Sequence, residues 1–98
     1  MSLPEQIKVG GMKYSVIEKD TVDNNPQCFG VCVYHDTHIE IKKDLAVERK
    51  EQTVIHEMLH GVFFESGFEE HQEEMINRVS TVLYQVLKDN DFSWIQKS

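Results

Sequence analysis

The sequence has few cysteines, and their spacing does not suit a disulfide. Two cysteines in 98 residues cannot form the disulfide framework of a small secreted domain. Cys28 and Cys32 lie in a segment predicted to be one strand, where their Cα atoms would be about 13 Å apart, too far to bridge. We therefore expect two free, buried thiols in a reducing compartment.

Long apolar runs and positive charge are also scarce. No stretch of about 18 apolar residues occurs, and no basic region followed by an apolar run opens the chain, so we expect no membrane span, no signal peptide and a cytoplasmic location. Ten Lys and Arg against 17 Asp and Glu give a net charge of −7. This charge argues against nucleic acid and anionic membranes as partners, because both are polyanions. It favours a cation as ligand.

The sequence does contain enough apolar residues for one core. With 98 residues, 40% of them hydrophobic, residues 1–98 are expected to form a single domain. Two strands are predicted within residues 6–19, joined by a hairpin turn at Gly10 and Gly11. Further strands are predicted at residues 28–34 and 38–42. Together these segments predict a small antiparallel sheet of three or four strands.

From Asp44 onward the spacing of the apolar residues becomes helical. Asp44 is expected to cap a helix that ends near Ser66 and Gly67, where the glycine is suited to a C-terminal cap. A second helix is predicted over residues 69–88, which carry a broad apolar stripe. The sequence therefore predicts an α+β fold, in which the small antiparallel sheet is followed by two helices.

The segment that indicates chemistry is residues 53–60, Thr-Val-Ile-His-Glu-Met-Leu-His. His56 and His60 are one helical turn apart, so both imidazoles leave the same face and can bind one metal ion. Glu57, next to the first histidine, can act as a base on the water that the metal activates. This His-Glu-x-x-His spacing on a helix is typical of zinc hydrolases. It predicts Zn²⁺ as cofactor, His56 and His60 as ligands, and Glu57 as the catalytic residue.

A catalytic zinc site needs a third protein ligand. Six acidic or imidazole side chains follow the motif: Glu65, Glu69, Glu70, His71, Glu73 and Glu74. At about 100° per residue, Glu73 lies on the flank of the apolar stripe, whereas Glu74 points toward solvent. A carboxylate at the border of a buried face needs a charged partner to offset its desolvation. Glu73 is therefore the preferred third ligand, and Glu70 and His71 remain alternatives.

This pattern resembles the gluzincin class of zinc metallopeptidases, and in particular small phage and prophage proteins related to the ImmA/IrrE family. The resemblance covers roughly residues 38–90, from the strand before the motif helix to the later helix that supplies a glutamate. It implies a minimal zincin-like domain, located in the bacterial host cytoplasm if the chain is encoded by a phage. In that family an Asn or Asp four residues after the glutamate often orients a zinc-bound histidine. Glu73 and Asn77 have this spacing, so the resemblance gives Asn77 that role.

The leading hypothesis is a zinc-dependent metallopeptidase that hydrolyses a peptide or protein substrate with Glu57 as general base. The substrate is expected to pair with an exposed edge strand at residues 38–42. The alternative is a zinc-stabilised, non-catalytic binding module of phage or prophage origin, because so short a chain leaves little material for a substrate cleft. A metal-free structural domain is a third interpretation. Four side chains are candidates to stabilise an oxyanion, and the sequence does not choose among them: Tyr34, His35, His38 and Tyr84.

Overall fold

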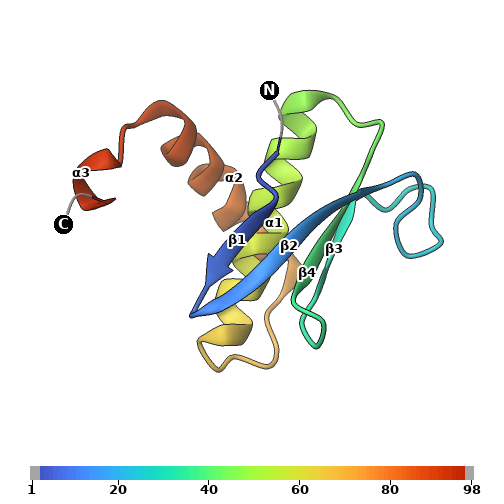
Figure 1. Ribbon diagram of the computed structural model, residues 1–98, viewed down its shortest axis with the longest axis horizontal. Coiled ribbons are helices and arrows are strands. Elements are labelled where there is room, and N and C mark those ends of the chain that lie inside the picture. Colours follow the sequence, from blue (N-terminus) through green and yellow to red (C-terminus); the bar gives the residue numbers. More distant parts are fainter. Residues whose placement is uncertain (1–2, 97–98) are drawn as a thin grey trace.

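Four strands are followed by three helices in residues 3–96, the part of the chain that the computed structural model describes (Figure 1). The elements are β1 (Gln6–Val9), β2 (Met12–Lys19), β3 (Gly30–Val33), β4 (His38–Lys42), α1 (Val47–Glu65), α2 (Glu73–Asp89) and α3 (Ser93–Gln96). The predicted α+β fold, a small sheet followed by two main helices, is confirmed. The third helix is only four residues long.

The sheet is mixed, so the prediction of a purely antiparallel sheet is wrong. The strand order is β1-β2-β4-β3, and β2 and β4 run parallel while the other two pairs are antiparallel. The connection from β2 to β4 contains β3 itself, which gives the chain enough length to return and enter β4 in the direction of β2. β4 is therefore an interior strand, and its apolar side chains, Ile39 and Ile41, are fully buried.

Helix α1 lies along one face of the sheet, and the core lies between them (Figure 1). The buried apolar cluster combines side chains of the sheet and of α1: Val9, Tyr14, Ile39, Ile41 and Val54. The hydroxyl of Tyr14 donates a hydrogen bond of 2.6 Å to the carboxylate of Glu65. This bond joins β2 to the last residue of α1, so the helix that carries the motif is fixed to the sheet at its C-terminal end.

Three glycines act as the sequence predicts. Gly10 and Gly11 form the two-residue turn between β1 and β2, with positive φ angles of 57° and 87°. Gly67, with φ of 100°, ends α1. The N–H of Phe68 donates to the carbonyl of Phe63 at 3.0 Å, and the rings of these two residues lie 5.8 Å apart. This is the Schellman arrangement of a glycine C-cap.

Both long helices begin later than the sequence predicts. The N-cap of α1 is Ala46, which makes no side-chain capping bond, so the expectation that Asp44 caps this helix is wrong. Helix α2 begins at Glu73 rather than near residue 69, because residues 68–72 continue in irregular conformation after the reversal at Gly67. This irregular segment brings the start of α2 to the middle of α1.

Helix α2 packs on α1 and leaves much of its surface exposed. Ile76 and Ser80, which face α1, are 0% and 2% exposed. In α3, Trp94 and Ile95 are 65% and 66% exposed, so this helix adds little to the core. No helix within residues 3–96 is both long and apolar enough to cross a membrane.

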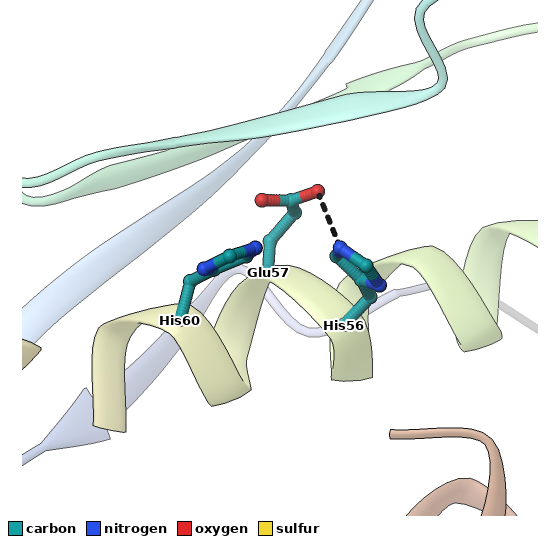
Figure 2. A group of neighbouring side chains, drawn as sticks. All are labelled: His56, Glu57 and His60. Atoms are coloured by element: carbon teal, nitrogen blue, oxygen red, sulfur yellow. Dashed lines mark ion pairs between the residues drawn. The ribbon is translucent and has the colours of Figure 1, made fainter. Parts of the chain in front are cut away.

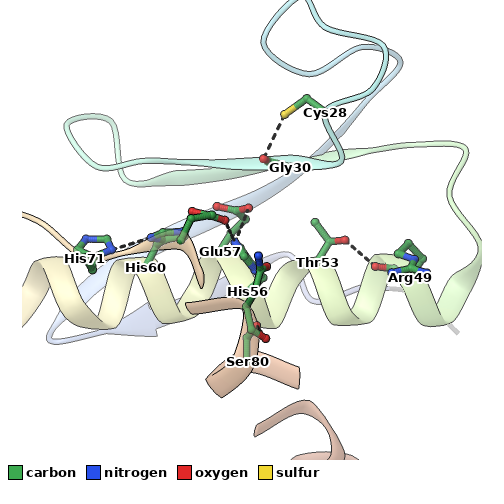
Figure 3. Close-up of polar contacts among 11 residues, drawn as sticks. Cys28, Gly30, Arg49, Thr53, His56, Glu57, His60, His71 and Ser80 are labelled. Atoms are coloured by element: carbon green, nitrogen blue, oxygen red, sulfur yellow. Dashed lines mark hydrogen bonds and ion pairs between the residues drawn. The ribbon is translucent and has the colours of Figure 1, made fainter. Parts of the chain in front are cut away.

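The two cysteines are free thiols, as predicted. Each is half-buried rather than fully buried. Cys32 lies in β3, whereas Cys28 precedes the strand and its thiol donates a hydrogen bond of 3.4 Å to the carbonyl of Gly30 (Figure 3).

Candidate metal centre

The two histidines of the motif and the glutamate between them lie on the middle of α1 (Figure 2). His56 and His60 leave the helix one turn apart, and their ring centroids are 5.1 Å from each other. One potential ligand atom from each of His56, Glu57 and His60 lies within 4.8 Å of the other two. The side chains are only 15%, 10% and 12% exposed, respectively. This group could therefore hold a metal ion.

Glu73, the first residue of α2, contacts both imidazoles. Its Oε1 lies 2.6 Å from Nε2 of His56, and its Oε2 lies 3.0 Å from Nε2 of His60. The structure thus brings together the three residues that the sequence predicts as ligands. Glu73 lies beside the face of α2 that buries Ile76 and Ser80, as the helical spacing indicates. Its side chain is 65% exposed, so the centre is open to solvent on the α2 side.

Within residues 3–96, the other acidic residues near the start of α2 form no ion pair with the motif histidines. Glu74 forms an ion pair of 2.9 Å with Arg78 and is 74% exposed. Glu69 and Glu70 are exposed, and within residues 3–96 neither forms an ion pair with a histidine of the motif. Of the candidate third ligands, Glu73 is therefore the one whose carboxylate faces both Nε2 atoms.

His71 contacts the other nitrogen of His60. Nδ1 of His71 lies 2.7 Å from Nδ1 of His60 (Figure 3). Burial lowers the pKa of His60, which favours the neutral form that binds metals. Histidines that bind a metal commonly donate their second N–H to a neighbouring group. His71 occupies that place, whereas no side-chain hydrogen bond in the described part of the chain joins Asn77 to either histidine of the motif.

Glu57 is buried between α1 and the sheet. Figure 2 shows its carboxylate pointing from the helix toward the strands, with Oε2 3.9 Å from Nε2 of His56. Burial, followed by the negative charge of Glu73, raises the pKa of Glu57 to about 8. A carboxyl group with a pKa near neutrality can both accept and release a proton at physiological pH, which is the property that a general base requires.

Two cavities meet beside Glu57. The larger, of about 410 Å³, and the smaller, of about 260 Å³, are both lined by Gly30, Glu57 and Glu73. We call the two cavities together the β3 groove, because both are also bordered by β3 or the residue before it. A Cβ atom on Gly30 would lie 2.7 Å from Cγ2 of Thr53 and 2.9 Å from the carbonyl oxygen of Glu40. The close approach of β3 to α1 at the groove therefore requires glycine at this position.

The exposed strand at the groove is β3. Because β4 pairs with β2 on one side and β3 on the other, the prediction of an exposed edge at residues 38–42 is wrong. Residues 38–42 alternate between polar and apolar because a strand has two faces. An interior strand also has two faces, so the alternation does not distinguish it from an edge strand. The N–H of Lys42 donates to the carbonyl of Phe29. In an antiparallel pair of strands, the residues of one strand alternately bond to the partner strand and face away from it. Since Phe29 bonds to β4, the N–H of Gly30 and the N–H and C=O of Cys32 face away from β4.

One of the four candidate oxyanion stabilisers borders the metal centre. Tyr34 lines the smaller cavity, and its ring stacks on that of Phe64 with centroids 4.3 Å apart. Burial raises the pKa of Tyr34 to about 12, so its hydroxyl keeps its proton at neutral pH. The hydroxyl of Tyr84 is bonded to Glu51 of α1, the ring of His38 is bonded to the nearby carboxylates of Asp36 and Glu40, and His35 is exposed.

The end of the groove that lies furthest from the histidines was not predicted from the sequence. Phe29, Arg49 and Gln52 line the larger cavity there. Arg49 precedes His56 by seven residues, which is two helical turns and places both side chains on one face of α1. Extending the helical pattern of the motif toward the N-terminus of α1 would have found this arginine. The approach of β3 depends on the sheet topology and carries no such signal.

Comparisons with family models, curated proteins and solved structures found no match to this chain. Its function must therefore be inferred from its own side chains. They bring together a group that could hold a metal ion, a buried carboxyl group beside it, and a groove that passes both.

Proposed function

We propose that this chain is a small zinc-dependent metallopeptidase, similar to the gluzincins related to the ImmA/IrrE family. The observation that supports this most strongly is the position of Glu73. Its two carboxylate oxygens meet the Nε2 atoms of His56 and His60, although α1 and α2 are separate helices. Two imidazoles and a carboxylate that converge in this way are a donor set of catalytic zinc sites, which keep one further position for water or substrate.

The chemistry of these donors fits zinc. Zinc binds neutral imidazole nitrogen and carboxylate oxygen, and burial of His60 favours its neutral form. A zinc ion held by His56, His60 and Glu73 would supply a Lewis acid and would lower the pKa of water toward neutrality. The open α2 side of the centre, where Glu73 is 65% exposed, gives solvent and substrate a way in.

Glu57 is the proposed general base. Its carboxylate lies on the sheet side of the histidines, where it faces the groove that both cavities share. In the proposed reaction Glu57 takes a proton from the water that attacks the peptide carbonyl and passes it to the leaving amine. Tyr34, which lines the smaller cavity, is placed to donate a hydrogen bond to the oxygen that becomes negative.

The β3 groove is the proposed substrate path. An extended peptide can pair with the free backbone groups of β3 and pass between that strand and α1. The main argument for a non-catalytic binding module was that so short a chain lacks a cleft. Cavities of about 410 and 260 Å³, both lined by Glu57, weaken that argument.

The experiment that tests the proposal compares hydrolysis by the zinc-loaded wild type with that by zinc-loaded Glu57→Gln. The substrates are fluorescein-labelled casein and a degenerate peptide library. We expect hydrolysis by the wild type, loss of hydrolysis with a chelator or in Glu57→Gln, and unchanged hydrolysis in Glu48→Gln, a matched change in the exposed first turn of α1. A zinc-loaded wild type that cleaves neither substrate would instead favour the binding module.

A further inference from the structure

The end of the β3 groove furthest from the histidines carries one positive charge. The larger cavity is lined there by Gln27, Phe29, Arg49, Gln52 and Thr53. Among residues 3–96, Arg49 is the only lysine or arginine that lines either cavity of the groove. The acidic residues that line it are Glu57 and Glu73, at its other end. Arg49 is therefore the position in the groove that can attract an anion.

The contacts of Arg49 leave its charge without a partner. One guanidinium nitrogen donates to Oε1 of Gln52 at 3.3 Å, and the guanidinium lies 5.9 Å from the centroid of the Phe29 ring. Neither neighbour is negatively charged, and within residues 3–96 Arg49 forms no ion pair. The helix dipole does not explain the arginine either, because it favours cations in the last turn, whereas Arg49 is in the first turn of α1.

The distance from Arg49 to the metal centre gives the number of substrate residues that would lie between them. Arg49 and His56 are separated by two turns of α1, or about 10 Å along the helix axis. An extended peptide advances about 3.3 Å per residue, so about three residues span this distance. Building on the proposed peptidase function, we propose that Arg49 binds a carboxylate of the substrate about three residues from the bond that is cleaved. An arginine suits this ligand because its planar donors match the two oxygens of a carboxylate.

The test uses two degenerate libraries of twelve-residue peptides, one with both ends blocked and one with a free carboxyl terminus. Zinc-loaded wild type is incubated with each library, and the products are sequenced by mass spectrometry. We expect Asp and Glu to be enriched about 10- to 100-fold over Asn and Gln about three residues from the cleaved bond. Enrichment in the blocked library identifies a side-chain carboxylate as the ligand. A preference confined to the unblocked library identifies the terminal carboxylate.

Variants then show whether Arg49 causes the preference. Arg49→Gln is expected to abolish it, Arg49→Lys to retain part of it, and Lys43→Gln, an exposed change before α1, to leave it intact. Cleavage without a carboxylate preference, or with one that Arg49→Gln leaves unchanged, would overturn this inference while the peptidase proposal stands.

A binding experiment tests the Arg49 site independently of peptide cleavage. The same libraries are dialysed against zinc-loaded Glu57→Gln, and the retained peptides are analysed. Carboxylate-dependent retention that is lost when Arg49→Gln is added supports the Arg49 site, and it does so even where the wild type cleaves nothing and the peptidase proposal fails. Absence of both cleavage and carboxylate-dependent retention would overturn both proposals.

Discussion

Nδ1 of His60 lies 2.7 Å from Nδ1 of His71, so one imidazole must donate its proton to the other. Nε2 of His60 faces Glu73. A metal bound at that Nε2 requires His60 to carry its proton on Nδ1 and to donate it to His71. The ring of His71 is itself held edge-on by Phe63 and Tyr34, with centroids 5.7 and 6.3 Å away. With a metal on Nε2, His71 would therefore accept the Nδ1 proton of His60 and hold the orientation of its ring.

Replacing His71 tests this contact. We expect His71→Ala to weaken zinc affinity about 10- to 100-fold, because His60 loses the partner of its second nitrogen. Asn77→Ala is the matched control, and it should change the affinity little because its side chain is bonded to neither histidine. The affinity is measured by competition with a chromogenic chelator. A greater loss in Asn77→Ala than in His71→Ala would show that the orienting role belongs to Asn77.

Adjacent glutamates at the start of α2 test the third ligand. Glu73→Ala is expected to lower zinc affinity by orders of magnitude, because it removes one of three protein donors. Glu74→Ala should leave the affinity almost unchanged, since Glu74 pairs with Arg78 and is 74% exposed. Zinc titrations of both variants give the comparison. Equal affinities in the two variants would remove Glu73 from the ligand set.

The buried carboxyl of Glu57 should make the stability of the metal-free protein depend on pH. Its pKa is about 8 in the folded chain against an ordinary value of 4.5, so between these values the folded state holds a proton that the unfolded chain releases. The free energy of unfolding therefore falls as pH rises from 4.5 to 8, by up to about 1.4 kcal/mol per pH unit. Below pH 4.5 both states are protonated and this contribution is fully present.

Urea denaturation in a chelating buffer, at intervals from pH 5 to pH 8, measures this effect. Subtracting the curve of Glu57→Gln removes the titration of His60 and of the other groups, which both proteins share. We expect the stability of the wild type to fall relative to Glu57→Gln across this range. Parallel curves would mean that Glu57 titrates in the folded chain as it does in the unfolded one.

Gly30, which lines the groove, and Gly61 of α1 should respond in opposite ways to alanine. In Gly30→Ala the new Cβ would meet Thr53 at 2.7 Å, so we expect a loss of about 1–3 kcal/mol in the free energy of unfolding. In Gly61→Ala the new Cβ would lie 3.7 Å from Sγ of Cys32, an ordinary contact, and alanine favours the helix by about 0.5–1 kcal/mol. Thermal and urea unfolding test the signs. A stabilising Gly30→Ala would show that β3 does not need to approach α1 closely.

Local signals in the sequence were sufficient for the parts of the molecule that depend on neighbours along the chain. The turn at Gly10 and Gly11 and the cap at Gly67 follow from backbone freedom, and both are confirmed. The common face of His56 and His60 follows from helical spacing. For the same reason, the helical angle favoured Glu73 over Glu74 but left Glu70 and His71 as alternatives, and the structure places the Glu73 carboxylate against both imidazoles.

One local signal failed, because the helix expected to be capped by Asp44 has Ala46 as its N-cap. The other errors concern pairings between distant segments. Interior and edge strands have the same alternation, so the sequence could not reveal that β4 lies between β2 and β3. Helix α2 begins only after the irregular segment that follows Gly67, at a point that lets Ile76 pack on α1. The start of α2 therefore depends on a contact with another helix. The irregular segment also brings His71 to His60, a contact between residues eleven positions apart for which helical spacing gives no indication.

Zinc stoichiometry by native mass spectrometry is the most direct test of the central claim, that His56, His60 and Glu73 hold a metal beside the base Glu57. We expect one zinc ion per chain in the wild type and in Glu57→Gln, and none in a variant that combines His56→Ala with His60→Ala. A wild type that takes up no zinc would contradict the account. Loss of the ion in Glu57→Gln would also contradict it, because Glu57 would then be a ligand and could not be the base.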